Sequence, residues 1–332
     1  MRVVYHFATI PEAIMTESKP IEVSENMTVS ELFEAWIAEK QKTVSANTVH
    51  MYRSYYDKYL DGSFGKRKVN EILPEEWSEF ENKLSTEKAS GKCKYGFTSL
   101  LHAFQMYHNV FNYGKTAFGL NDPTGTISLV AEEKDSLPVF SHNEIRKMIL
   151  TVKPFDIYHI GTMLCLYTGI TLGEVCGAKW QDVDTDNKML RVRRKLVKEN
   201  EVRDGQNTAV LKTNELKGKA VRDIPIPVWL NDQLKEIKNT HSDDEFILVG
   251  PLGGNDFSNF RYHYKDLLKQ AGVGYRKPNA LRHTFAMTCI EKGIDLKTLS
   301  DLLGHSNLQI TIKMYLNTDI ENSRQKLETL YD

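Results

Sequence analysis

The first third of the chain carries apolar stripes at helical spacing, separated by polar faces. Thr28 to Glu31 form a capping box, in which a side-chain oxygen and a carboxylate satisfy orphan amides, and an apolar stripe follows directly. The same periodicity predicts three further helices, which begin near Ala46, Pro74 and Thr98. Turn residues at 121–125 close this block, so we predict a four-helix domain over residues 26–125.

The rest of the chain mixes helices with short alternating strands. Ser141 to Glu144 form another capping box, which opens a second domain over residues 138–332. Three segments in it alternate apolar and polar residues, namely 188–197, 207–213 and 221–226. They predict a small antiparallel sheet, after which helices resume. The predicted fold class is therefore mainly α with a small antiparallel sheet, in a helical domain followed by a mixed α/β domain.

The segments outside these two domains are short. Residues 1–25 have no sustained period and contain two prolines, so we expect an extended N-terminal arm, and residues 126–137 should form a linker. No run approaches the roughly 18 uninterrupted apolar residues of a membrane helix. The start of the chain also lacks the order of a secretion signal. We therefore expect a cytoplasmic protein with no membrane partner.

Composition and charge narrow the classes of function only slightly. With 332 residues, 41% of them hydrophobic and 26% charged, the chain has a globular composition, which excludes collagen, coiled coil and wholesale disorder. A net charge of -1 would by itself disfavour nucleic acid as a partner, but basic clusters at 66–68 and 191–195 allow a basic face. The cysteines are far apart in sequence and are expected to be free thiols: Cys93, Cys165, Cys176 and Cys289.

The strongest motif lies near the C-terminus. The chain has no phosphate-binding G-x-x-x-x-G-K-[ST] loop, no G-x-G-x-x-G and no H-E-x-x-H, so nucleotide-driven and metalloprotease chemistry are not expected. Instead, Asn279-Ala-Leu-Arg282-His283-Thr opens a predicted helix, a Leu-Leu-Gly-His305-Ser turn follows, and Tyr315 comes ten residues later.

This block resembles the tyrosine recombinase family, the phage-type integrases. The family pattern is H-x-x-R-H-T, then an L-L-G-H-S turn, then a tyrosine about ten residues on. Arg282, His305 and Tyr315 match it in identity and spacing. Residues 166–183 resemble the family's T-G-L-R-x-x-E-L and W-x-D segments, and Lys212 resembles its sheet lysine. The helical domain resembles the family's core-site-binding, SAM-like domain.

The resemblance implies a covalent route for opening a DNA phosphodiester. Tyr315 would attack the phosphorus and form a 3′-phosphotyrosyl link, while Lys212 would protonate the leaving 5′-oxygen. Arg282 and His305 would hold the non-bridging oxygens. Because the phosphotyrosine ester stores the bond energy, the resemblance implies no metal and no other cofactor. Lys217 and Lys219 lie in the same predicted hairpin as Lys212, so the choice among these lysines stays open.

Two positions depart from the family pattern. Thr171 stands where the family has its first arginine, and Asn279 stands where it has a histidine. Asn279 can still hydrogen-bond a phosphate oxygen but cannot act as an acid or base. A missing charged contact can cost on the order of 10²–10⁵ in rate. Lys179 or a cation within 191–195 is an alternative source of that charge; without one, Thr171→Arg is expected to raise cleavage at least about tenfold.

The resemblance also implies partners. These are double-stranded DNA with paired core sites, three further copies of the chain in a homotetramer on DNA, and accessory DNA-bending or excision factors. Basic residues of the helical domain are candidates for phosphate contacts, which position a protein without specifying sequence. They are Arg53, Lys58, Lys66, Arg67, Lys68, Lys92 and Lys94.

We therefore predict a site-specific recombinase or integrase, acting for a mobile element. Thr171 supports an alternative from another class, a catalytically degenerate relative that binds DNA as a regulator or architectural protein. A third interpretation, a helical interaction scaffold without a DNA role, would require the match from Arg282 to Tyr315 to be chance. An assay for covalent attachment to DNA separates the first two.

Overall fold

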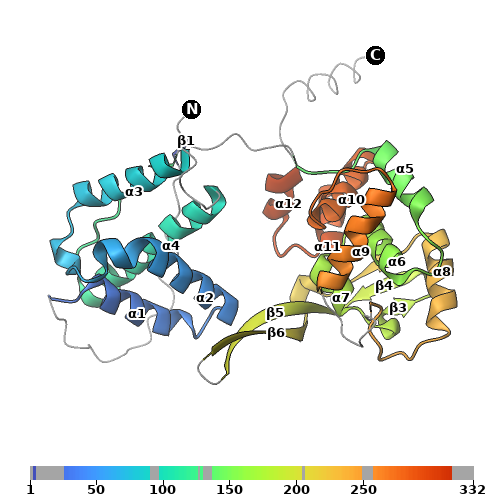
Figure 1. Cartoon of the computed structure of the whole chain (residues 1–332), viewed down its shortest axis with the longest axis horizontal. Coiled ribbons are helices and arrows are strands. Elements are labelled where there is room, and N and C mark those ends of the chain that lie inside the picture. Colours follow the sequence, from blue (N-terminus) through green and yellow to red (C-terminus); the bar gives the residue numbers. More distant parts are fainter. Residues whose placement is uncertain are drawn as a thin grey trace, which may run out of the picture. The chain divides into compact units, whose positions relative to one another are not determined.

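Two compact units make up the chain, one mainly within residues 1–135 and the other mainly within 136–332 (Figure 1). Each has its own hydrophobic core. The residues that the computed structural model describes are 3–4, 26–89, 97–125, 128–129, 137–203, 206–248 and 257–315.

The first unit begins with helix α1 (Val29–Lys40). The Glu31 amide donates to the Thr28 hydroxyl at 3.3 Å, and the Thr28 amide donates to the Glu31 carboxylate at 2.8 Å, which confirms the predicted capping box. The apolar stripe that follows is buried, as predicted; its members are Leu32, Phe33, Trp36 and Ile37.

Helix α2 (Ala46–Tyr55) continues directly into a π-helical segment, η1 (Tyr56–Gly65). The glycines at 62 and 65 and the basic residues at 66–68 predict a break after the second helix, and the π-helical segment ends at Gly65. A Cβ on Gly65 would lie 2.4 Å from Oδ1 of Asp61, so only glycine fits there without rearrangement. The ring of Tyr56 stacks on Phe33 with centroids 4.0 Å apart, which joins the segment to α1.

A short 3-10 turn, η2 (Val69–Glu71), leads into α3 (Pro74–Ala89), and α4 (Phe97–Phe118) completes the predicted set of four helices. Trp77 is fully buried between these helices and packs edge-on against Phe111. Two short strands, β1 (Val3–Val4) and β2 (Ser128–Leu129), pair antiparallel within the segments expected to be arm and linker.

The second unit is built around helix α6 (Ile157–Thr168). Ten of its twelve residues are buried, because α7 (Leu172–Gly177) and three later helices pack against it. Helix α5 (His142–Thr151) precedes it and begins with the capping box predicted at Ser141. After α7, a 3-10 turn, η3 (Trp180–Asp182), leads into the sheet.

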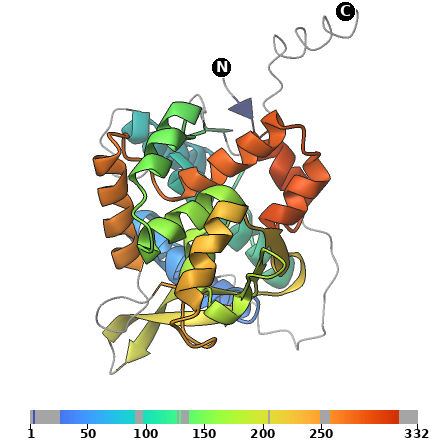
Figure 2. The same cartoon turned by 90° about the vertical axis from the view of Figure 1, so that its right-hand side faces the viewer.

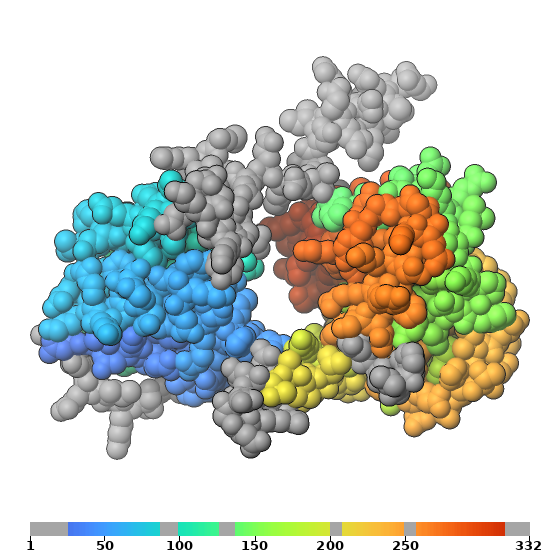
Figure 3. Space-filling model, in the orientation of Figure 1, coloured from blue at the N-terminus to red at the C-terminus, as the bar shows by residue number. Residues whose placement is uncertain are grey.

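The strands of the second unit form two separate sheets. Strands β3 (Val183–Asp184), β4 (Met189–Val192) and β7 (Arg222–Pro225) form an antiparallel sheet in the order β3-β4-β7, in which Val192 lies opposite Arg222. Strands β5 (Arg194–Arg203) and β6 (Gln206–Glu215) pair with each other and project from the body of the unit (Figures 1 and 3). The single strand predicted over 188–197 is therefore divided at Arg193.

In the described residues after β7, five helices follow: α8 (Val228–Lys238), α9 (Phe257–Gln270), α10 (Asn279–Glu291), α11 (Leu296–Leu303) and α12 (Leu308–Tyr315). Helices α10, α11 and α12 pack in sequence and lie side by side in both cartoon views (Figures 1 and 2). The mainly helical fold with a small antiparallel sheet agrees with the prediction. No helix in the described part of the chain is long and apolar enough to cross a membrane.

Candidate active site

Tyr315 ends helix α12, and its side chain is only 6% exposed. Its phenolic oxygen lies 3.1 Å from Nδ1 of His283 on α10. Burial raises the pKa of the Tyr315 hydroxyl, whereas the charge of Arg282 and a hydrogen bond from it act in the opposite direction. The hydroxyl is thus enclosed between two nitrogen-bearing side chains of one helix.

Asn279 and His283 are one helical turn apart on α10 and contact each other. Nδ2 of Asn279 lies 2.8 Å from Nε2 of His283. An amide nitrogen only donates, so in this orientation Nε2 accepts and the ring proton is on Nδ1, which donates to Tyr315. Burial and the neighbouring Arg282 lower the pKa of His283, which favours the neutral ring. Asn279 therefore orients the histidine that contacts Tyr315.

Arg282 lies at the centre of this cluster and is nine-tenths buried. Its Nη1 donates to the carbonyl of Gly169 at 2.8 Å, and its Nη2 donates to the carbonyl of Leu303 at 2.7 Å. Leu303 ends helix α11, where carbonyls lack helical partners and carry partial negative charge. The guanidinium is thus fixed by backbone on two sides. The Arg282 guanidinium also faces the Tyr315 hydroxyl.

His305 follows the left-handed Gly304 at the end of α11. Its Nδ1 lies 2.8 Å from the hydroxyl of the fully buried Thr311, which fixes the ring. Burial, followed by repulsion from Arg282 and Arg222, lowers the pKa of His305 to about 4, so the ring is neutral at pH 7. The structure therefore brings four of the predicted residues near one another: Tyr315, Arg282, Asn279 and His305.

Thr171 has a structural role at the start of α7. Its hydroxyl donates to Oε2 of Glu174 at 3.0 Å and accepts the Glu174 amide at 3.3 Å, while its own amide donates to the same carboxylate at 2.7 Å. These bonds form a capping box. The hydroxyl is therefore already engaged at the position where the family pattern has an arginine.

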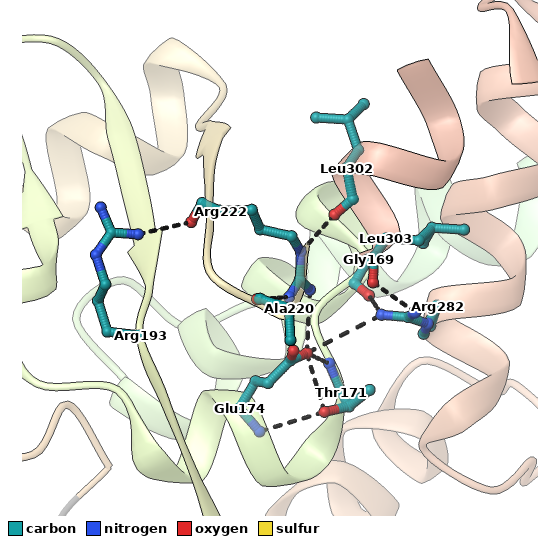
Figure 4. Close-up of polar contacts among 9 residues, drawn as sticks. All are labelled: Gly169, Thr171, Glu174, Arg193, Ala220, Arg222, Arg282, Leu302 and Leu303. Atoms are coloured by element: carbon teal, nitrogen blue, oxygen red, sulfur yellow. Dashed lines mark hydrogen bonds and ion pairs between the residues drawn. The ribbon is translucent and has the colours of Figure 1, made fainter. Parts of the chain in front are cut away.

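Arg222 on β7 is a buried cation beside this cap to which the sequence motifs assign no role (Figure 4). Its Nη1 and Nη2 donate to the two carboxylate oxygens of Glu174, at 2.7 and 3.2 Å. Its Nε donates to the carbonyl of Leu302 at 2.6 Å, and Nη1 also donates to the carbonyl of Ala220 at 2.9 Å.

A signal for Arg222 was present in the sequence. Arg222 shares the inward phase of β7 with the buried Ile224, while Asp223 and Pro225 are exposed. An arginine in the apolar phase of a strand indicates a buried partner, since buried charges are paired. The second missed residue, His283, directly follows Arg282 in the quoted motif.

Lys212 lies on the β5–β6 hairpin, where its ammonium pairs with Glu199 at 3.5 Å. The alternative lysines of that region, Lys217 and Lys219, are exposed. Among the suggested substitutes for the missing arginine, Lys179 lies over the ring of Phe246. The arginines near it in sequence have acidic partners: Arg191 pairs with Asp184, Arg193 with Asp223, and Arg194 with Asp182 and Glu215.

Several basic candidates of the helical unit are already in ion pairs. Arg53 contacts Glu34 through both terminal nitrogens, at 2.5 and 2.9 Å, and Arg67 contacts Glu76 in the same way, at 3.1 and 3.0 Å. Lys68 lies 3.4 Å from Glu71. The side chains of Lys58 and Lys66 are exposed, and Lys92 and Lys94 lie outside the described residues.

Comparison with known families identifies the family of both units. Residues 138–322 match the phage integrase family, and residues 28–85 match the phage integrase N-terminal SAM-like domain. The chain therefore belongs to the phage integrase family and is a tyrosine recombinase by descent.

Individual relatives extend over most of the chain. A tyrosine recombinase XerC-like protein of Caldanaerobacter subterraneus subsp. tengcongensis is 31% identical over 93% of this chain and 84% of its own length. The Tn1549 transposon integrase, solved with transposon right end DNA, has a TM-score of 0.74 at 18% identity and covers 92% of this chain and 100% of its own. A lambda integrase tetramer bound to a Holliday junction has a TM-score of 0.59 at 15% identity, over 87% and 77% of the two chains.

Proposed function

We propose that the protein is a site-specific DNA recombinase that cuts and rejoins duplex DNA through a 3′-phosphotyrosyl intermediate. The single observation that carries the proposal is the position of Tyr315, whose hydroxyl is held between Arg282 and His283 in a chain of this family. A nucleophile beside a buried cation is the arrangement that attack on a phosphodiester requires.

In the proposed reaction, the Tyr315 oxygen bonds to the phosphorus and the bond to the 5′-oxygen breaks. The phenolic proton leaves to solvent, and Lys212 gives a proton to the departing 5′-oxygen. Arg282 and His305 stabilise the charge on the non-bridging oxygens. His283 and Arg282 donate to the phenolic oxygen, which favours the phenolate over the phenol. Reversal of the steps with a 5′-hydroxyl from another strand restores a phosphodiester and frees the tyrosine.

We propose duplex DNA with paired core sites as the partner and a homotetramer as the active assembly. The Tn1549 integrase bound to transposon DNA and the lambda integrase tetramer on a junction support this assignment. The transposon relative also supports a role in a mobile element. Sequencing the DNA on both sides of the gene tests that role, since an attachment site beside the gene is expected.

The cleavage step is tested with a nicked duplex that the protein selects from a random-sequence pool through repeated rounds of binding. We expect a covalent protein–DNA adduct that is stable to denaturation. Tyr315→Phe should abolish the adduct and leave DNA affinity nearly unchanged, because the lost hydroxyl contributes chemistry more than binding. An adduct that persists in the Phe variant would contradict the role of Tyr315.

A second candidate function is a DNA-binding relative without catalytic activity. Thr171 favours it, since the guanidinium of the family pattern is absent at that position. On this candidate, the selected duplex is bound with a salt-dependent affinity but no adduct forms with the unaltered protein. The same assay therefore decides between the two functions.

A further inference from the structure

Two guanidinium groups rest on consecutive carbonyls at the end of α11 (Figure 4). Nε of Arg222 donates to Leu302 at 2.6 Å, and Nη2 of Arg282 donates to Leu303 at 2.7 Å. These carbonyls lie at the negative end of the helix, so they favour cations. The last turn of α11 therefore holds the two arginines as neighbours.

The carboxylate of Glu174 lies between the two arginines. Both of its oxygens accept from Arg222, and Oε2 is 4.0 Å from Nη1 of Arg282. The same oxygen accepts from Thr171. Position 171 and the Arg222 guanidinium thus converge on one carboxylate from different elements, the start of α7 and the start of β7.

The charges of these groups show what Arg222 contributes. Burial opposes ionisation of Glu174, but the hydrogen bonds and charge of Arg222, together with the Thr171 amide and the charge of Arg282, outweigh it and hold the pKa of this carboxyl below its usual range. His283 and His305 are neutral at pH 7, because their pKa values are lowered. Without Arg222, the Glu174 carboxylate would cancel the charge of Arg282. With Arg222, the cluster keeps a net charge of +1.

Arg222 also reaches the turn that carries His305. A Cβ on Gly304 would lie 2.9 Å from Nη1 of Arg222 and 3.2 Å from its Cζ. The guanidinium plane therefore lies against the backbone just before His305. Only glycine at position 304 leaves room for the Arg222 guanidinium.

We propose that Arg222 supplies the second guanidinium of the phosphate site, in place of the arginine that is absent at position 171. This inference rests on the function proposed above. Arg222 acts on the same scissile phosphate as Arg282 and stabilises the negative charge of its non-bridging oxygens in the transition state. The recombinase is thus complete in cations despite Thr171.

The test removes the Arg222 guanidinium from the protein and one negative charge from the DNA in turn. Arg222→Gln alone would leave a buried carboxylate unpaired, so the test variant combines Arg222→Gln with Glu174→Gln, which leaves two neutral amides. Because one positive and one negative charge are removed together, the cluster keeps its net charge of +1 from Arg282, and a slower reaction reports the loss of the Arg222 guanidinium itself. Two nicked duplexes of the selected sequence are compared. One has the natural phosphodiester and the other has a methylphosphonate at the cleavage position, where a methyl group replaces one charged oxygen.

On the phosphodiester, the double variant should form the covalent adduct at least about 100-fold more slowly than the unaltered protein. On the methylphosphonate, which has no charge for Arg222 to neutralise, the two proteins should differ by less than about threefold. Arg276→Gln is the matched control, because Arg276 also donates through both terminal nitrogens to one carboxylate, that of Glu144, at 2.8 and 3.4 Å, and has no role in the proposed site. It should leave adduct formation unchanged on both duplexes.

Other outcomes overturn the inference or the function beneath it. An equal loss on both duplexes would assign Arg222 a purely structural role, and thermal unfolding of the double variant would then reveal the damage. An unchanged rate on the phosphodiester would also reject the inference. If the unaltered protein binds the duplexes but forms no adduct on either, the proposed recombinase function fails, and the inference fails with it.

Discussion

Nδ1 of His283 lies 3.1 Å from the phenolic oxygen of Tyr315, although 32 positions separate the two residues in the chain. The amide of Asn279 on the other side of the ring places the proton on the nitrogen that contacts the tyrosine. The proposed nucleophile is therefore held by a chain of two hydrogen bonds that starts on its neighbouring helix.

Replacing His283 by phenylalanine should slow adduct formation by about 10- to 100-fold, because a hydrogen bond to a charged oxygen contributes about 1.5–3 kcal/mol. A phenyl ring takes the place of the imidazole and fills similar space, so DNA affinity should hardly change. Asn279→Ala should have a smaller effect in the same direction, since it leaves the imidazole in place. Single-turnover adduct formation and gel-shift titration measure the two quantities. A full rate in His283→Phe would contradict the proposed stabilisation of the phenolate.

The stability of the protein should fall as the pH drops from about 6.5 to about 4. In this window, a histidine of ordinary pKa near 6.5 binds a proton in the unfolded chain, whereas His305, with its pKa lowered to about 4, stays neutral in the folded one. The unfolded state is thus favoured by protonation. As the pH is lowered across this range, the melting temperature of the unaltered protein should fall relative to that of His305→Gln, which has no group that titrates there. Parallel curves would show that His305 does not contribute.

Thr171→Arg should not raise the rate of cleavage, because Arg222 already provides the charge and the Thr171 hydroxyl serves the α7 cap. This expectation reverses the tenfold gain that the motif alone predicts. Loss of the cap should lower the free energy of unfolding by about 1 kcal/mol. Thr171→Ser keeps the cap and is the control for both measurements, which are adduct rate and denaturant unfolding. A tenfold faster Thr171→Arg protein would show that the site lacks a cation.

Gly304 and Gly293 offer a matched pair of alanine substitutions. Both glycines have positive φ, +70° and +79°, but only the added Cβ at Gly304 meets Arg222, while Gly293 has nothing within 4 Å. Each variant should lose about 1–2 kcal/mol of stability from the backbone conformation. Only Gly304→Ala should in addition slow adduct formation, because it displaces a guanidinium. Equal adduct rates in the two folded variants would argue against contact between the Gly304 turn and the catalytic cluster.

Local features of the fold were predictable from short stretches of sequence. The capping boxes at Thr28 and Ser141 each involve residues three apart, so a window of four residues contains the whole interaction. The motif around Arg282 likewise identified the residues of one helix and one turn. The π-helical form of residues 56–65 was not predictable in this way; the segment places Tyr56 against Phe33, which is 23 positions earlier in the chain.

The contacts of Arg222 could not be predicted from short stretches of sequence. Its partners Glu174 and Leu302 are 48 and 80 residues away, and no periodicity links these three segments. The motif identified a missing arginine by position in the chain, whereas the site requires charge at a position in space. Only the fold places Arg222 of β7 against Glu174 of α7 and the end of α11, where we propose that it supplies this charge.

The anchoring of both guanidinium groups on main-chain oxygens has a consequence for how such a site can change. The backbone carbonyls of residues 302 and 303 are present whatever side chains these residues carry. Single substitutions in α11 therefore do not remove the hydrogen-bond acceptors of the two arginines. An arginine can then be lost from one element and gained on another while its docking point persists. The C-terminal carbonyls of α11 thus form a binding site for positive charge that does not depend on the side chains of the helix. Arginines from different parts of the chain can occupy it.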